Sequence, residues 1–378
     1  MIELPRKYVD LTNLTMDGQR LPIEYVRSEI IWRNEEPAFQ PIIQELEAAP
    51  QPGFFLTSKQ NERTVRVRWH LNRHCVLKSD VFYGSEGALY RDIDAKGVGY
   101  TRNFPMIFLS VREPEMKNDM EMRGILHNEV ATEDCLITEE ISKLGIRAAR
   151  YIAQIELFEL VKGDGQVVPR QAIGKELWLN FDSVRPTIAV RAMGTTSRVY
   201  DLGIHQETNN GAYVKEIVDD AIGLVSLELG QKLTPKDYVA WFTETMGKQL
   251  GKLHKSKIWT DFMVQIHQGT HNLTLDCRLT DTYHYQTPLS AKRRYEYLVR
   301  RAAEDPKWNL FLESDFPSNL TKEEVKAAIA NNKKGEEEDK RSHLFTARDF
   351  VDGVNEIYPV GKPEEFKDMF NRAYLSER

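Results

Sequence analysis

The sequence has few cysteines, no long apolar run and no strong excess of charge of one sign. Its three cysteines, Cys75, Cys135 and Cys277, lie far apart and form no CxxC pair. This argues against a disulfide framework or a zinc knuckle and suits a reducing compartment. No apolar stretch approaches the ~20 residues of a membrane span, and the first residues lack the apolar core of a signal peptide. The sequence therefore predicts a cytoplasmic protein with no membrane partner.

The charge and length of the chain narrow its class further. The net charge is only −6 over 378 residues, which disfavours nucleic acid as the main partner. Hydrophobic residues make up 41% of the sequence, enough to form a core, and the length suits two lobes or two domains.

Composition and periodicity divide the chain into four parts. Residues 1–55 are rich in proline and predict an N-terminal arm, and residues 56–160 predict a small β-rich N-lobe. Residues 161–300 predict a larger helical C-lobe, and residues 301–378 a C-terminal helical extension that contains a solvated, charged linker at 331–341. Strands first and helices afterwards predict an α+β fold.

Within these parts the patterns predict individual elements. Strands are expected at 64–69, 75–82, 88–95, 150–160 and 185–193, and helices at 128–144 and 234–255. The second helix has a clear start, because Thr234 is followed by a proline and then by an acid at the third helical position.

The most informative segment lies between His267 and Asp281. Residues 273–275 and 278–280 predict two short strands joined by a turn, with Asn272 just before the first and Asp281 just after the second. A hairpin returns its ends to the same place, so the amide oxygen and the carboxylate can bind one cation. Mg²⁺ prefers such oxygen ligands. It is equally simple that Asn272 and Asp281 only cap turns.

Two further features of the sequence, a lysine after a predicted strand and a pair of arginines, can bind phosphate groups. Lys96 ends a predicted strand before a glycine-containing turn, where it can contact phosphates if an acid from the next helix holds it. The available acids are Glu133, Asp134 and Glu139. Arg191 and Arg198 flank a small polar turn, and guanidinium groups clamp phosphates bidentately. Solvated surface side chains are the simpler alternative for the lysine and for the arginines.

The order and spacing of these features resemble the selenoprotein O family of kinase-fold AMP transferases. That family has a Lys-Gly-x-Gly segment ending in Tyr-Ser-Arg, to which residues 96–102 are similar although shorter, and a helix ending in Leu-Gly-Ile, as at 144–146. Its paired arginines lie seven residues apart, as Arg191 and Arg198 do, and its metal-binding Asn and Asp lie nine apart, as Asn272 and Asp281 do. The resemblance covers residues 91–283.

The resemblance implies a protein-kinase-like fold of two lobes with ATP and Mg²⁺ in the cleft between them. In that family the nucleotide lies reversed, so that AMP and not the γ-phosphate is transferred. It implies the following roles: phosphate binding by Lys96, the helix-acid position for Asp134, a triphosphate clamp by Arg191 and Arg198, and Mg²⁺ binding by Asn272 and Asp281.

The sequence departs from the family at the catalytic base. His271 stands where the family has an aspartate, and His267 lies five residues before Asn272, where an ordinary kinase has its catalytic aspartate. Histidine accepts a proton near neutral pH, so either residue can act as the base. The family's cysteine-containing C-terminal tail has no counterpart, because no cysteine follows Cys277.

Three functions fit these observations. The first, which the sequence favours, is a nucleotidyltransferase that moves AMP from ATP to a protein hydroxyl or a small-molecule acceptor. The second is an ATP-dependent ligase of the glutamylase type that forms an acyl-adenylate. The third is a pseudokinase that binds a nucleotide without turnover because histidine has replaced the base.

Overall fold

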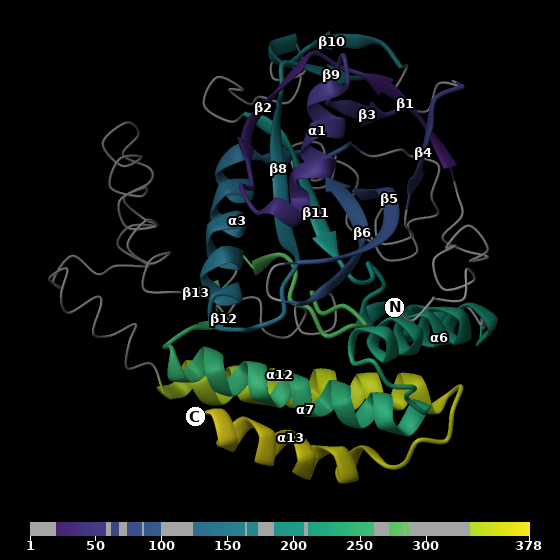
Figure 1. The fold of residues 1–378 in the computed structure, drawn as a ribbon, viewed down its shortest axis with the longest axis vertical. Coiled ribbons are helices and arrows are strands. Elements are labelled where there is room, and N and C mark those ends of the chain that lie inside the picture. Colours follow the sequence, from purple (N-terminus) through teal and green to yellow (C-terminus); the bar gives the residue numbers. More distant parts are fainter. Residues whose placement is uncertain are drawn as a thin grey trace, which may run out of the picture.

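The computed structural model describes residues 20–57, 62–67, 74–84, 87–99, 124–162, 165–172, 185–207, 211–260, 272–282, 285–286 and 333–378. Within these ranges the fold is α+β, as the order of elements in the sequence predicts, with one large antiparallel sheet and a separate group of helices (Figure 1).

The sheet has nine strands in the order β2-β8-β11-β6-β5-β4-β1-β3, and β7 pairs with β11 beside this path. Their bounds are β1 Arg20–Tyr25, β2 Ser28–Arg33, β3 Phe54–Leu56, β4 Thr64–Val67, β5 His74–Tyr83, β6 Leu89–Lys96, β7 Leu126–His127, β8 Arg150–Leu157 and β11 Pro186–Met193. Two small ribbons, each of two strands, accompany it: β9 Glu159–Val161 with β10 Val167–Pro169, and β12 Trp259–Thr260 with β13 Tyr285–Gln286.

The helices fall into two groups. On the sheet, α3 (Asn128–Ser142) packs along β8 and β11, and α1 (Gln40–Ala48) follows the short 3₁₀ helix η3 (Pro37–Phe39). Below the sheet in Figure 1, α7 lies between the sheet and α13 and runs beside α12. The bounds of this second group are α5 Val199–Glu207, α6 Gly211–Glu228, α7 Pro235–Lys255, α12 Lys333–Asn355 and α13 Pro363–Glu377. Across the described ranges, no helix combines the length and the apolar character needed to cross a membrane.

The predicted start of α7 is confirmed. The backbone N–H of Asp237 donates to Thr234 Oγ1 at 3.2 Å, and the backbone N–H of Thr234 donates to Asp237 Oδ2 at 3.1 Å. This reciprocal pair is a capping box, which satisfies two N–H groups that an uncapped helix leaves without partners. A local sequence pattern therefore fixed where this helix begins.

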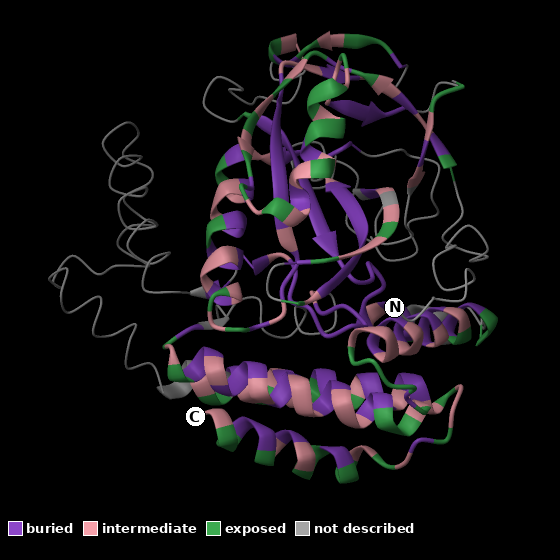
Figure 2. Ribbon diagram, in the orientation of Figure 1, coloured by how far each residue is buried: buried purple, intermediate pink, exposed green. Residues whose placement is uncertain are grey.

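Three clusters of buried hydrophobic residues underlie the described part of the fold, two of them large, and buried residues fill the sheet and line the helices below it (Figure 2). The sheet core contains Ile93 and Ala95 of β6 and Val190 of β11, and the helical core joins α3, α5, α6, α7, α12 and α13. Because side chains alternate along a strand, the residues next in sequence to these sheet-core residues lie on the opposite face of β6 and β11. That face is where the polar cluster described below begins.

Three sequence-based boundaries differ from the structure. The described part of the predicted arm, residues 20–55, supplies β1, β2 and most of β3 to the sheet, and β11, assigned to the C-lobe, pairs with β6 and β8. The charged run from Lys333 onward is the first part of α12 rather than a linker. Its Asp339 is buried and lies 3.0 Å from Nε2 of His254 on α7. Contacts between segments far apart in the sequence place the arm, β11 and the charged run, and the periodicity of a sequence does not reveal such contacts.

Candidate functional site

The segment 272–282 is a tight hairpin-like turn whose two ends meet, as predicted, but isolated bridges at Leu273, Thr274 and Leu279 take the place of the two expected strands. Cys277 N donates to Thr274 O at 2.8 Å, Thr274 N donates to Arg278 O at 3.0 Å, and Thr280 N donates to Asn272 O at 2.8 Å. The apolar side chains of the turn, Leu273, Leu275, Cys277 and Leu279, belong to the helical core. The hairpin therefore holds its open end, with Asn272 and Asp281, at the border between the helices and the sheet.

Three cations converge on the carboxylate of Asp281. Lys96 Nζ lies 2.5 Å from Oδ1, and Arg191 Nη1 donates to the same oxygen at 3.0 Å. Arg198 Nη1 approaches the other oxygen, Oδ2, at 3.4 Å. The structure thus brings together residues that are up to 185 positions apart and that the sequence analysis selected separately.

These charges control the ionisation of Asp281. Burial alone would raise the pKa of its carboxyl, but Lys96, Arg198 and Arg191 outweigh burial and hold the pKa well below its usual range. The side chains of Asp281 and Lys96 keep 14% and 16% of their surface exposed. The carboxylate is therefore ionised at neutral pH, and solvent reaches both it and the lysine.

Arg191 is fixed by a residue that the sequence analysis did not single out, Asp94. Its Nε and Nη2 donate to Asp94 Oδ1 and Oδ2 at 3.0 and 2.7 Å, and the two residues lie directly opposite each other on β11 and β6. The Arg191 side chain has no exposed surface. The signal was present in the sequence, because Asp94 and Lys96 are two apart in a strand and so share a face.

Asp134 connects α3 to the residue after Asp281. Its Oδ1 accepts a hydrogen bond from Thr282 Oγ1 at 2.7 Å, and its Oδ2 accepts one from the hydroxyl of Tyr151 on β8. Another acid of the same helix, Glu139, instead binds Arg150 at 2.9 Å. Asp134, on the helix that precedes β8, therefore helps to fix the position of the hairpin end.

The glycines after Lys96 are required by the backbone. Gly97 has a φ of +93°, a left-handed value that L side chains avoid, and a Cβ there would lie 2.3 Å from the carbonyl oxygen of Thr187. At this close approach to β11 the strand β6 ends, and Lys96, its last residue, lies beside Asp281.

Arg198 is anchored on the hairpin itself. Its flanking residues bond to the first hairpin strand, since Leu275 N donates to Ser197 O at 2.8 Å and Val199 N donates to Leu273 O at 3.0 Å. Arg198 N also donates to Asp201 Oδ2 at 2.7 Å. Its Nη1 lies 3.2 Å from Asn272 Oδ1, so that one guanidinium nitrogen contacts oxygens of both Asn272 and Asp281.

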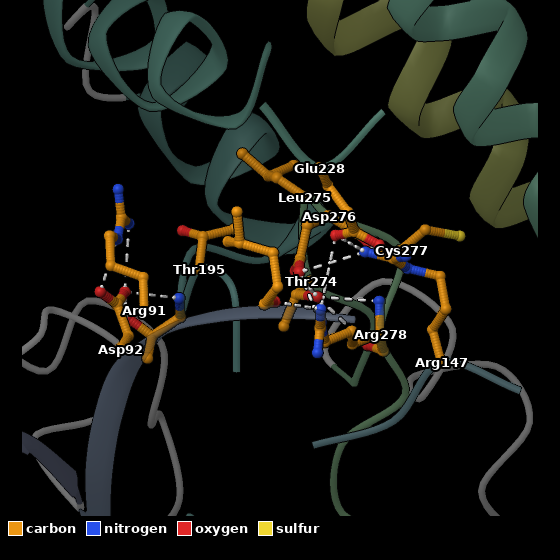
Figure 3. A network of polar contacts seen from close by, with 12 residues as sticks. Arg91, Asp92, Arg147, Thr195, Glu228, Thr274, Leu275, Asp276, Cys277 and Arg278 are labelled. Atoms are coloured by element: carbon orange, nitrogen blue, oxygen red, sulfur yellow. Dashed lines mark hydrogen bonds and ion pairs between the residues drawn. The ribbon is translucent and has the colours of Figure 1, made fainter. Parts of the chain in front are cut away.

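A second polar network locks the hairpin tip to the sheet (Figure 3). Arg278 donates from Nε to Asp276 Oδ2 at 2.6 Å and from Nη2 to Leu89 O on β6 at 2.5 Å. The Arg278 guanidinium carbon also lies 4.4 Å from the ring centroid of Tyr90. Nearby, Arg91 Nη1 and Nη2 bind both oxygens of Asp220 on α6, at 2.5 and 2.9 Å. These buried contacts hold the hairpin in a fixed position relative to β6.

Gly194, which follows β11, leaves room for this network, and its replacement should disrupt it. A Cβ at this position would lie 2.2 Å from Asp276 Oδ2, which Arg278 holds in place. We expect Gly194→Ala to destabilise the chain by about 1–3 kcal/mol, measured by urea unfolding. Gly203→Ala is the matched control, because nothing lies within 4 Å of a Cβ there. The control should be neutral or slightly stabilising, since alanine favours helix. Equal stability of the two variants would contradict the packing described here.

The predicted bases, His267 and His271, lie outside the described residues, although His271 directly precedes Asn272 in the chain. Among the residues that the structure describes, no group of three or more His, Cys, Asp or Glu side chains is arranged to hold a metal ion. No protein-family model matches the sequence, and no curated protein matches it either.

Proposed function

We propose that the chain binds ATP with Mg²⁺ in a protein-kinase-like cleft and transfers AMP to a hydroxyl of a protein or small-molecule acceptor. The observation that carries this proposal is the convergence of Lys96, Arg191 and Arg198 on Asp281, at the border of the sheet core and the helical core. Lysine and arginine side chains that gather in this way suit a polyphosphate ligand.

The arrangement of elements supports the kinase-like part of the proposal. A lysine ends a strand of an antiparallel sheet, a helix packs on that sheet, and a hairpin on the helical core supplies an Asn and an Asp to the same place. Kinase-like sites use these components to hold phosphates and metal. The sequence resemblance adds the reversed orientation of the nucleotide and hence the transfer of AMP.

The oxygen atoms of Asn272 and Asp281 fit a magnesium ion. Both lie within 3.4 Å of one positively charged atom, Arg198 Nη1, so they already converge on a single cationic position. Mg²⁺ takes one or two protein oxygens and completes its octahedron with phosphates and water. When bound there, Mg²⁺ would neutralise charge on the phosphates.

The chain's residues have separate tasks in this reaction. Lys96, whose side chain keeps 16% of its surface exposed, and the buried Arg198 would bind phosphate oxygens, while Arg191, held by Asp94, would position Asp281. The acceptor oxygen bonds to the α-phosphorus as the bond from that phosphorus to the α–β bridging oxygen breaks. Pyrophosphate leaves with the electron pair, and the hydroxyl proton passes to a base, for which His271 is the proposed residue.

Separately labelled ATP tests the direction of transfer. With ATP labelled at the α-phosphate, we expect label to become covalently attached to an acceptor and unlabelled pyrophosphate to form in equal amount. With label at the γ-phosphate, we expect all label in pyrophosphate. Attachment of the γ-label would make the protein an ordinary kinase and would overturn AMP transfer. Tight binding of Mg·ATP without any turnover across many acceptors would favour a pseudokinase.

A further inference from the structure

The guanidinium of Arg198 lies at the position where the two proposed metal ligands converge. Its Nη1 is 3.2 Å from Asn272 Oδ1 and 3.4 Å from Asp281 Oδ2. The other carboxylate oxygen, Oδ1, faces Lys96 Nζ at 2.5 Å and Arg191 Nη1 at 3.0 Å. The two oxygens of Asp281 therefore have different partners, and Arg198 contacts the one that is shared with Asn272.

In this geometry Arg198 and a metal ion compete for the same two oxygens. A divalent cation that bound Asn272 and Asp281 while Arg198 stayed in place would meet a positive charge at contact distance, with two more cations on the far side of the carboxylate. Like charges at such separation in a partly buried site repel strongly. The side chain of Arg198 is only 4% exposed, so water screens this repulsion poorly.

Arg198 can leave these ligands without disturbing the hairpin. The backbone on either side of it is bonded to Leu273 and Leu275, so the position of the hairpin does not depend on the two contacts of the Arg198 guanidinium. Asp281 would also keep its place, because Oδ1 remains bonded to Lys96 and Arg191, and Arg191 is held in turn by Asp94. The hairpin and the Asp281 carboxylate are thus held by contacts other than those of the Arg198 guanidinium.

We propose that Arg198 gates the metal site: its side chain holds Asn272 and Asp281 until the phosphates of a nucleotide draw it away, so that nucleotide binds first and the divalent cation binds only with it. The anionic phosphate offers the guanidinium a bidentate acceptor in exchange for the two oxygens. This inference rests on the proposed nucleotide site and adds an order of binding to it. It also gives Arg198 two successive partners, first the metal ligands and then the phosphates.

The test measures binding of Mn²⁺, a paramagnetic substitute for Mg²⁺, to the full chain by electron paramagnetic resonance. Without nucleotide, the parent should bind Mn²⁺ weakly, and Arg198→Gln should bind it about tenfold or more tightly, because the gating charge is gone. Adding Asp281→Asn to Arg198→Gln should remove this gain. Arg33→Gln is the control, because Arg33, at the end of the edge strand β2, forms an exposed ion pair with Glu47 of α1. This variant should bind Mn²⁺ as the parent does.

A second variant and a second ligand keep the outcomes distinct. If Arg198→Gln does not fold, as judged by circular dichroism, Arg198→Met replaces it, because its apolar chain suits a buried position. Non-hydrolysable ATP should tighten Mn²⁺ binding in the parent by more than in Arg198→Gln. Two results would overturn the gate and leave the nucleotide site standing. One is tight Mn²⁺ binding by the parent without nucleotide, and the other is an unchanged Mn²⁺ affinity in the folded Arg198 variant. Failure of the parent to bind the nucleotide with or without metal would instead overturn the proposed function.

Discussion

Asp281→Asn should abolish Mg²⁺-dependent binding of ATP, with a loss of affinity of roughly 100-fold or more. Asparagine keeps the shape of the side chain but removes the charge that a divalent cation requires and that Lys96, Arg191 and Arg198 surround. Asparagine is preferable to alanine, because alanine would also leave a cavity beside three cations. Calorimetric titration with ATP at saturating Mg²⁺ measures the effect.

The same variant should respond in the opposite direction without metal. Removing a carboxylate from the cluster makes it more positive, so the affinity for metal-free ATP, measured in the presence of a chelator, should stay equal or rise. A general loss of folding would lower both affinities together. Asp352→Asn, at a half-exposed ion pair with Arg348 on α12, is the control and should change neither. If Asp281→Asn binds Mg·ATP as the parent does, Asp281 is not a metal ligand.

The parts of this site that sequence could predict are the local ones. The hairpin at 272–282 follows from alternating apolar residues around a short turn, and the start of α7 follows from the capping box at Thr234. Lys96 at the end of β6 follows from strand alternation ended by Gly97. In each case residues within a few positions of one another determine the structure, so a local pattern is sufficient.

The parts that sequence missed depend on contacts between distant segments. Nothing local places Asp94 opposite Arg191, because the register between β6 and β11 joins residues 97 positions apart. The burial of Arg191 has the same origin. The solvated alternative considered for the paired arginines is wrong for both, since Arg191 and Arg198 are buried.

The choice among the acids of α3 also needed the structure. Glu133, Asp134 and Glu139 all lie on one helix, and a sequence gives no way to rank them by distance from the site. In the fold Asp134 is buried and bonds to Thr282 and Tyr151, whereas Glu139 is partly exposed and pairs with Arg150. Asp134 therefore acts through the neighbour of Asp281, a contact that no spacing in α3 could show.

His271→Ala should slow turnover by ~10²–10⁴-fold while the affinity for ATP changes little. His271 directly precedes Asn272, which the hairpin fixes next to Asp281 and Arg198. We propose that a base directly before Asn272 takes the proton of the acceptor hydroxyl, and a neutral imidazole accepts a proton near neutral pH. Single-turnover kinetics with ATP labelled at the α-phosphate separates the chemical step from binding.

Two further variants separate a base from a structural histidine. His271→Asp should retain more activity than His271→Ala, and its pH optimum should move downward, because a carboxylate is deprotonated from about pH 4 and imidazole only from about pH 6.5. His254→Gln is the matched control, since His254 is buried, with Asp339 Oδ2 and the Tyr374 hydroxyl at 3.0 and 3.1 Å, and its loss should lower thermal stability without slowing the chemical step. If His271→Ala reacts as fast as the parent, His271 is not the base, and His267→Ala becomes the deciding variant. Unchanged turnover there too would leave neither histidine as the base and would show that transfer proceeds with a different proton acceptor.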